Sequence, residues 1–319
     1  MPDQLGPPLP QPLFGRVAII GLGLIGSSLA RVARRKGLAK TIVAIDLSDA
    51  VRARVAELGI ADEVAETPEA GVRDADLVIL CVPVGANATV AAVIGPHLKT
   101  GAVMSDVGSV KASVIANVTP YLRPDISLVP AHPVAGTEFS GPDAGFATLF
   151  VNRWCILTPP DGTDPAATEK VRAFWSAAGS NVEIMSATHH DLVLAITSHV
   201  PHLIAFNIVG TAAHLEQVTN SEVIKFSAGG FRDFTRIAAS DPTMWRDVFL
   251  NNKDAVLDML GRFNDDLAAL RGMVERSDGD GLFDLFTRTR AIRRGIIDIG
   301  QETQKADFGR LPAGSDESQ

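Results

Sequence analysis

The sequence predicts an α/β domain built on a parallel-rich sheet, followed by an all-α domain. Three observations support this fold class. The chain has 319 residues, enough for about two domains of ~100–200 residues each. Short apolar runs alternate with helical patterns up to about Met185, as in the βαβ units of a parallel sheet. Beyond that residue the strand signals stop and long segments of helical periodicity follow.

These patterns divide the chain into four parts. The prolines that crowd the first residues predict a flexible leader at 1–14, and they include no signal-peptide pattern. The α/β domain is expected at 15–185 and the helical domain at 186–305. The polar, Gly- and Ser-containing end predicts a flexible tail at 306–319.

The elements of the first domain follow in order. A strand at 17–21 precedes a helix at 27–36, and a strand at 41–46 precedes a helix at 50–58. Further strand candidates lie at 77–82, 102–106, 127–130, 154–158 and 181–185. We expect a parallel sheet from these strands, with helices on both faces.

The second domain is predicted from apolar-periodic stretches at 188–215, 221–229, 243–275 and 282–299. Residues 192–213 are almost entirely apolar, which is long enough for a membrane span. Polar residues such as Asn207 interrupt the run, so we expect burial in a domain or subunit core instead. One small helical domain gives such a run little cover, and we therefore predict a homodimer and no membrane contact.

The composition of the chain limits the classes of function that it can have. The net charge of −8 and the pI near 5.4 argue against a nucleic-acid-binding surface. Cys81 and Cys155 lie in apolar runs, as expected for buried thiols in a reducing compartment, so we predict a cytoplasmic protein. No Cys, His or Asp spacing predicts a metal site. A small-molecule substrate fits these features.

A glycine-rich turn links the first strand to the first helix. The pattern G-x-G-x-x-G predicts a Rossmann-type dinucleotide site, in which the glycines permit a tight turn and close approach to a pyrophosphate. Asp46 ends the second strand, where its carboxylate suits ribose hydroxyls and would repel a 2′-phosphate, so NAD is preferred over NADP. The candidate cofactor-binding residues are Gly21, Leu22, Gly23, Leu24, Ile25, Gly26, Asp46, Cys81, Val82, Pro83 and Ser109.

Two polar side chains near the ends of later strands are candidates for the chemistry. The hydroxyl of Ser109 suits a substrate alcohol near a nicotinamide, although it would equally suit the N-cap of a helix from Val110. His132 lies in a loop bounded by Pro and Gly residues. An imidazole there suits a base for hydride chemistry, or a residue that caps the loop.

Five motifs occur in a fixed order: 21–28 (GLGLIGSS), 106–111 (DVGSVK), 131–138 (AHPVAGTE), 198–202 (SHVPH) and 229–238 (GGFRDFTRIA). Together they resemble the prephenate and arogenate (cyclohexadienyl) dehydrogenases of tyrosine biosynthesis. The resemblance implies a Rossmann domain followed by a helical dimerisation domain. It also implies NAD-dependent oxidative decarboxylation of prephenate, arogenate or both to 4-hydroxyphenylpyruvate, tyrosine or both. We favour dual specificity.

The resemblance also implies roles for individual residues. His132 would accept the ring hydroxyl proton while hydride goes to NAD, with Ser109 orienting the hydroxyl. Arg236 would clamp a substrate carboxylate, with Arg232 one helical turn away on the same face. Ser198 and His202 would meet the substrate from the apolar helix, which Pro201 should bend or break. The other candidate substrate-binding residues are Thr137, Glu138 and Trp245.

Two alternatives remain at this point. A β-hydroxyacid or 6-phosphogluconate-type dehydrogenase would have a similar arrangement of domains. Such enzymes use a catalytic lysine in the helical domain, and Lys225 and Lys253 here lack the motif of that lysine. A non-catalytic NAD-sensing protein would need no shared pocket for His132 and the arginines. We assign His190 to a structural role and His199 to packing.

Overall fold

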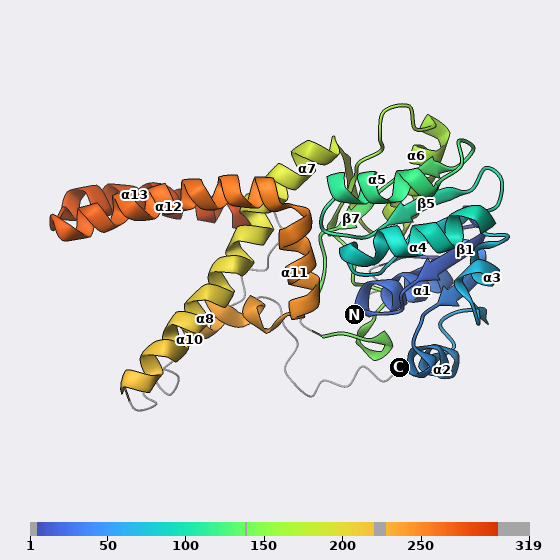
Figure 1. The fold of residues 1–319 in the computed structure, drawn as a ribbon, viewed down its shortest axis with the longest axis horizontal. Coiled ribbons are helices and arrows are strands. Elements are labelled where there is room, and N and C mark those ends of the chain that lie inside the picture. The colour runs from blue at the N-terminus through green and yellow to red at the C-terminus, as the bar shows by residue number, and fades with distance from the viewer. Residues whose placement is uncertain (1–4, 138, 220–227, 299–319) are drawn as a thin grey trace. The chain divides into compact units, whose positions relative to one another are not determined.

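The computed structural model describes residues 5–137, 139–219 and 228–298 (Figure 1). Compactness divides the chain into two units, residues 1–259 and 260–319. This division lies later than the change of periodicity near residue 185. Trp245 and Val248 share a hydrophobic cluster with the α/β core, which joins the first helices of the predicted helical domain to the first unit.

A six-stranded sheet forms the centre of the first unit, in the order β3-β2-β1-β4-β5-β6. All of its neighbouring strands are parallel, so the predicted Rossmann-type sheet is confirmed. The two-residue strand β3 was not predicted, because so short a run carries no periodicity. The strands are β1 Phe14–Ile20, β2 Ala39–Ile45, β3 Glu63–Val64, β4 Leu77–Leu80, β5 Val103–Asp106 and β6 Ser127–Leu128.

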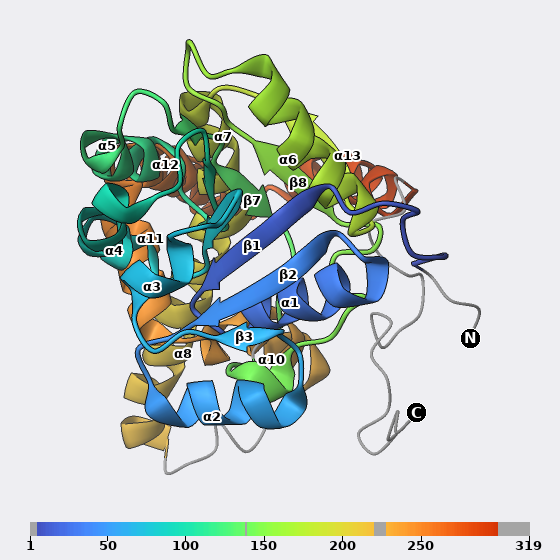
Figure 2. The same cartoon turned by 90° about the vertical axis from the view of Figure 1, so that its right-hand side faces the viewer.

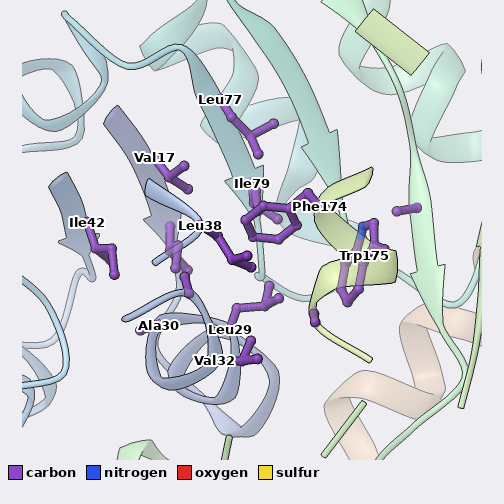
Figure 3. Close-up of a cluster of buried hydrophobic side chains, with 14 of the residues drawn as sticks. Val17, Leu29, Ala30, Val32, Leu38, Ile42, Leu77, Ile79, Phe174 and Trp175 are labelled. Carbon is purple, nitrogen blue, oxygen red and sulfur yellow. The ribbon is translucent and has the colours of Figure 1, made fainter. Parts of the chain in front are cut away.

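Helices cover both faces of this sheet (Figure 2). They are α1 Leu24–Lys36, α2 Asp49–Leu58, α3 Pro68–Val72, α4 Asn87–Ile94, α5 Ala112–Val118 and α6 Pro165–Ala177. Alternate residues of β1 point to opposite faces: Val17 packs with α1 and α6, whereas Ala18 packs with α3, α4 and α5. Figure 3 shows the first cluster, where Leu29 lies near the rings of Phe174 and Trp175. Burial on both faces explains the continuous apolar runs in the sequence.

The last strands correct the expectation of a single parallel sheet. Three strands, β7 Ala131–Pro133, β8 Trp154–Leu157 and β9 Asn181–Ile184, form a separate mixed sheet. Strand β7 runs antiparallel to β8, with His132 opposite Ile156. His132 therefore lies in a strand rather than in a loop. The pairing satisfies the backbone of this buried segment, which a loop would leave without partners.

The described residues after β9 form helices and no strand, as predicted. The elements are α7 Ala187–Leu194, a π-helical segment Ala195–His199, α8 Val200–Thr219, α10 Gly229–Thr235, a 3-10 segment Arg236–Ala239, α11 Pro242–Asn251, α12 Lys253–Glu275 and α13 Gly279–Asp298. Pro201 does not break the helix, because it lies in the first turn of α8 and a widened turn precedes it. The stretch 243–275 is two helices that divide at Asn252, and most of the stretch 221–229 lies outside the described residues.

Part of the expected leader, from residue 5 onward, makes defined contacts with the α/β domain. Leu5 is buried, and its carbonyl accepts a hydrogen bond from Nζ of Lys36 at 2.7 Å. The backbone N–H groups of Leu9 and Leu13 donate to Lys36 and Leu38. These contacts attach the segment to the end of α1 and to the turn that follows it.

One helical run, Ala187–His214, is long and apolar enough to cross a membrane by length and composition. Only 28% of its most apolar stretch is buried in the structure. Leu192, Ile196, Ile208 and Val209 remain exposed. Much of this run is therefore not covered by the described residues of its own chain.

Candidate active site

The glycine-rich turn follows β1 and opens α1. Gly21 has a φ of +92°, and a Cβ there would lie 2.6 Å from the carbonyl oxygen of Cys81. A Cβ on Gly26 would lie 1.9 Å from the carbonyl oxygen of Gly21. A Cβ on Gly23, in contrast, would meet nothing within 4 Å among the described residues. The outer glycines are thus required by packing, and the middle one leaves open space beside the helix.

That open space suits an anion. Gly23 is the N-cap of α1 and has no side chain that could cap the helix. The first N–H groups of α1 can therefore donate hydrogen bonds to a phosphate. Beside the turn, Asp46 receives the N–H of Leu22 at 2.8 Å and the N–H of Ser48 at 2.9 Å. Each carboxylate oxygen keeps further acceptor capacity toward a ribose hydroxyl. The residues present fit a dinucleotide without a 2′-phosphate.

The other predicted cofactor-lining residues lie at the same edge. Cys81, Val82 and Pro83 follow β4, and Ser109 follows β5, so they meet at the carboxyl ends of neighbouring strands. Burial raises the pKa of the Cys81 thiol, which suits a lining residue rather than a nucleophile. Helix α5 begins at Ala112 with Lys111 in the cap position, so Ser109 is not its N-cap.

His132 is buried and belongs to a chain of three side chains. Its Nδ1 lies 2.8 Å from Nε2 of His190, whose Nδ1 lies 2.8 Å from Oδ1 of Asp191. The two oxygens of Asp191 also accept the N–H groups of Lys111 and Ala112, at 2.8 and 2.9 Å. A carboxylate can only accept, so His190 donates from Nδ1 and accepts at Nε2. His132 must then donate from Nδ1, and its Nε2 carries the lone pair.

The histidines of this cluster are held neutral. Burial lowers the pKa of His132 well below its usual value, and the nearby His190 and Lys111 lower it further. Burial likewise lowers the pKa of His190, and it lowers that of His199 to about 4. A neutral His132 with an unprotonated Nε2 is competent to accept a proton at neutral pH.

His190 and Asp191 were missed as functional residues by sequence reasoning. They stand next to each other in α7, far along the chain from His132, and the adjacent His-Asp pair was their only signal. His199, assigned to packing, is fully buried. Its Nδ1 lies 3.0 Å from Nδ2 of Asn252, which also donates to the carbonyl of Asp191 at 2.8 Å. His199 thus packs beside the cluster and shares a partner with it.

His202 and Trp245 form the centre of the predicted substrate side. Their rings stack with centroids 3.6 Å apart and an interplanar angle of 22°. Nδ1 of His202 donates to the carbonyl of Ser198 at 2.8 Å, which leaves Nε2 as an acceptor in the neutral ring. Burial lowers the pKa of His202, and the charge of Arg236 lowers it further. Four predicted residues, Ser198, His202, Arg236 and Trp245, are therefore brought together.

Two other predicted substrate residues, Arg232 and Thr137, are exposed. Helix α10 ends at Thr235 and Arg236 opens a 3-10 segment, so Arg232 and Arg236 do not share one α-helical face as expected. The tighter turn of a 3-10 segment changes the direction of the second side chain. Thr137 is exposed, and its hydroxyl accepts the N–H of Phe139 at 3.3 Å. Glu138 lies outside the described residues.

Two family models match this chain. "Prephenate dehydrogenase, nucleotide-binding domain" matches residues 29–184, and "Prephenate dehydrogenase, dimerization domain" matches residues 186–288. The chain belongs to the prephenate dehydrogenase family. This membership makes it an oxidoreductase and excludes the hydroxyacid dehydrogenase and the non-catalytic sensor as alternatives.

Similar members of the prephenate dehydrogenase family cover most of the chain. The cyclohexadienyl dehydrogenase of Zymomonas mobilis is 44% identical and matches 89% of this chain and 97% of its own length. The prephenate dehydrogenase of Aquifex aeolicus, solved with hydroxyphenyl propionate and NAD+, is 34% identical with a TM-score of 0.83, over 88% of this chain and 98% of its own. The Synechocystis arogenate dehydrogenase is 25% identical with a TM-score of 0.75, over 88% and 99%.

Proposed function

We propose that this chain catalyses the NAD-dependent oxidative decarboxylation of both prephenate and arogenate, giving 4-hydroxyphenylpyruvate and tyrosine. Membership of the prephenate dehydrogenase family supports the reaction, and similarity to a cyclohexadienyl dehydrogenase supports dual specificity. The observation that carries the proposal is the hydrogen-bonded chain from His132 through His190 to Asp191. It presents an unprotonated nitrogen of a buried imidazole for the proton that alcohol oxidation releases.

The cofactor is NAD, which supplies the hydride acceptor when it is bound. The turn Gly21–Gly26 and the N-terminus of α1 would hold its pyrophosphate, and Asp46 its adenosine ribose. Cys81, Val82 and Pro83 would line the nicotinamide side. Asp46 also excludes a 2′-phosphate through charge repulsion.

His132 acts as the base in this proposal. Its Nε2 takes the proton from the ring hydroxyl as the hydride leaves the same carbon. The electrons of the breaking O–H bond form the ring carbonyl. The ring carboxylate then leaves as CO2, the electrons of its bond to the ring pass to the carbonyl oxygen and restore aromaticity, and that oxygen recovers the proton from His132. The imidazolium that forms is stabilised by His190, which accepts from Nδ1, and by the negative charge of Asp191 behind it.

The remaining residues orient the substrate. The Ser109 hydroxyl would hold the ring hydroxyl near the nicotinamide, and Arg236 would form a charge-assisted pair with a substrate carboxylate. His202, fixed against Trp245 and tied to Ser198, would offer Nε2 as a hydrogen-bond acceptor. Arg232, Thr137 and Glu138 remain candidates for contacts that form with substrate.

We also propose a homodimer in the cytoplasm. The apolar run Ala187–His214 has little cover among the described residues of its own chain. In the second unit, Phe283 and Phe286 are 70% and 54% exposed. A matching surface of a second copy would cover such residues. Sedimentation of the wild type should give a dimer. The substitution Phe283→Asp should weaken this dimer, whereas the control Tyr121→Asp, on the nucleotide-binding domain, should not. A wild-type monomer at micromolar concentration contradicts the proposal.

Turnover tests the function directly. Purified protein is mixed with NAD and either prephenate or arogenate, and NADH formation is followed by its ultraviolet absorbance. NADH from both substrates is the expected result. NADH from one substrate alone overturns the dual specificity, and NADH from neither overturns the function itself.

A further inference from the structure

Lys111 is the largest charged side chain that is fully buried in the described chain, and the proposed mechanism does not use it. Its Nζ lies 2.5 Å from Oδ2 of Asp106, which is 1% exposed, and 2.7 Å from the carbonyl oxygen of Ala131. An ion pair removed from water in this way is costly unless further hydrogen bonds satisfy it. The N–H groups of Gly108 and Ala131 supply such bonds to Asp106.

These contacts reach both ends of the histidine chain. Ala131 precedes His132 in β7, and the Lys111–Asp106 pair holds both its carbonyl and its N–H group. The backbone N–H of Lys111 donates to Oδ1 of Asp191, the oxygen that also receives His190. Lys111 therefore contacts both the strand that carries His132 and the carboxylate of Asp191.

The charges around His132 come from every element packed against it. Asp106 and Lys111 lie at the end of β5 and the start of α5, His190 and Asp191 lie in α7, Cys155 lies in β8 and His199 lies in the π-helical segment. Burial raises the pKa of the Cys155 thiol and lowers the pKa of each histidine, so these groups are neutral at pH 7.

The ion pair of Asp106 with Lys111 and the carboxylate of Asp191 remain. Burial raises the pKa of Asp106 and lowers that of Lys111, and the contact between the two side chains at 2.5 Å opposes both shifts. Of this pair, Lys111 is the charge that lowers the pKa of His132. The carboxylate of Asp191 is left to balance the one proton that oxidation of the alcohol delivers to His132. The Lys111 ammonium also opposes a premature positive charge on that ring.

We propose that Lys111 is a positioning residue for the oxidation: its ammonium, paired with Asp106, fixes the strand of His132 and keeps that imidazole unprotonated until the substrate proton arrives. This inference rests on the proposed function. Lys111 acts through Ala131 and Asp106 and does not itself contact the reacting atoms.

The test replaces the pair rather than one member, because a single substitution would leave a buried charge without a partner. Asp106→Asn/Lys111→Met removes both charges at nearly constant volume. The matched control is Asp76→Asn/Lys99→Met, which removes a partly exposed ion pair whose Asp76 directly precedes β4. Both enzymes are assayed for NADH formation across pH, with NAD binding and unfolding measured alongside.

We expect kcat of the first double variant to fall about tenfold or more. The acid limb of kcat/KM should move to higher pH by roughly one unit, because the cation that opposed protonation is gone. The control should change neither. If the first variant does not fold, Asp106→Asn/Lys111→Gln keeps a hydrogen-bonding amide pair without charge and should show the same shift in pH.

An unchanged acid limb in a folded double variant overturns the proposal, whether or not kcat falls, because a purely structural pair would lower kcat without moving the pH profile. Failure of the proposed function is distinguishable: the wild type would then show no turnover with either substrate.

Discussion

Nδ1 of His132 lies 2.8 Å from Nε2 of His190, and the two rings meet edge to face at 70°. Asp191 fixes the proton of His190 on the far nitrogen. The contact therefore sets the tautomer of His132, and the unprotonated Nε2 is left for chemistry.

Replacing His190 by leucine should lower kcat by about tenfold to a hundredfold. Leucine cannot accept from His132, so the imidazole loses the partner that selects its tautomer and stabilises its charged form. The KM for NAD should stay the same, since the glycine-rich turn is untouched. Steady-state kinetics measure the change, with His189→Leu as the matched control because His189 is the exposed neighbour. Equal kcat in the two variants would show that the contact does not assist the reaction.

Asp191→Asn should lower stability as well as activity. The carboxylate oxygens accept from Lys111 and Ala112 on one side and from His190 on the other. An amide turns its NH2 group toward one of these buried donors, at a cost of about 1–3 kcal/mol in the free energy of unfolding. Urea unfolding measures the loss against Asp161→Asn, an exposed substitution. Equal stability of the two variants would contradict the geometry of this network.

Activity and stability should both fall on the acid side. The pKa values of His132, His190 and His199 are lowered in the folded chain, so the unfolded chain binds more protons below pH ~6.5. Their contribution to stability is complete above that pH and is lost below it, by up to ~1.4 kcal/mol per pH unit for each histidine. Urea unfolding at several pH values measures this slope.

The acid limb of kcat should lie well below pH 6.5, and a limb at or above that value would contradict a neutral, buried His132.

Asp46→Ser should change cofactor preference. Serine removes the negative charge beside the ribose and weakens the acceptor for its hydroxyls, so kcat/KM should fall about tenfold with NAD and rise with NADP. Asp49→Ser, at an exposed carboxylate on the adjacent helix α2, is the control. Retained discrimination against NADP in the Asp46 variant would place the selectivity elsewhere.

Local patterns predicted the fold because each is set by neighbouring residues. The alternation of apolar runs and helices indicates burial on both faces of the central sheet. The glycine pattern from Gly21 to Gly26 indicates a turn in which a Cβ on either of these two residues would collide with backbone atoms. The sequence could not reveal that β7 pairs antiparallel with β8, because three residues carry no periodicity.

The candidate site was predicted less completely for a related reason. Motifs proposed His132, Ser109, His202 and Arg236, but the partners of His132 depend on contacts between distant segments. His190 contacts His132, and Asp191 contacts His190, only because α7 packs beside β7 and the start of α5. Lys111 is part of a recognised motif, yet its burial and its bond to Ala131 follow from tertiary structure alone.

The role of His132 as the base is the central claim, and the kcat of His132→Asn tests it most directly. NADH formation is measured at saturating NAD and prephenate for this variant and for His189→Asn, with NAD binding confirmed for both. We predict a fall in kcat of about 10²–10⁴-fold for His132→Asn and no comparable change for His189→Asn. Full turnover by a His132→Asn protein that binds NAD and substrate would contradict the account.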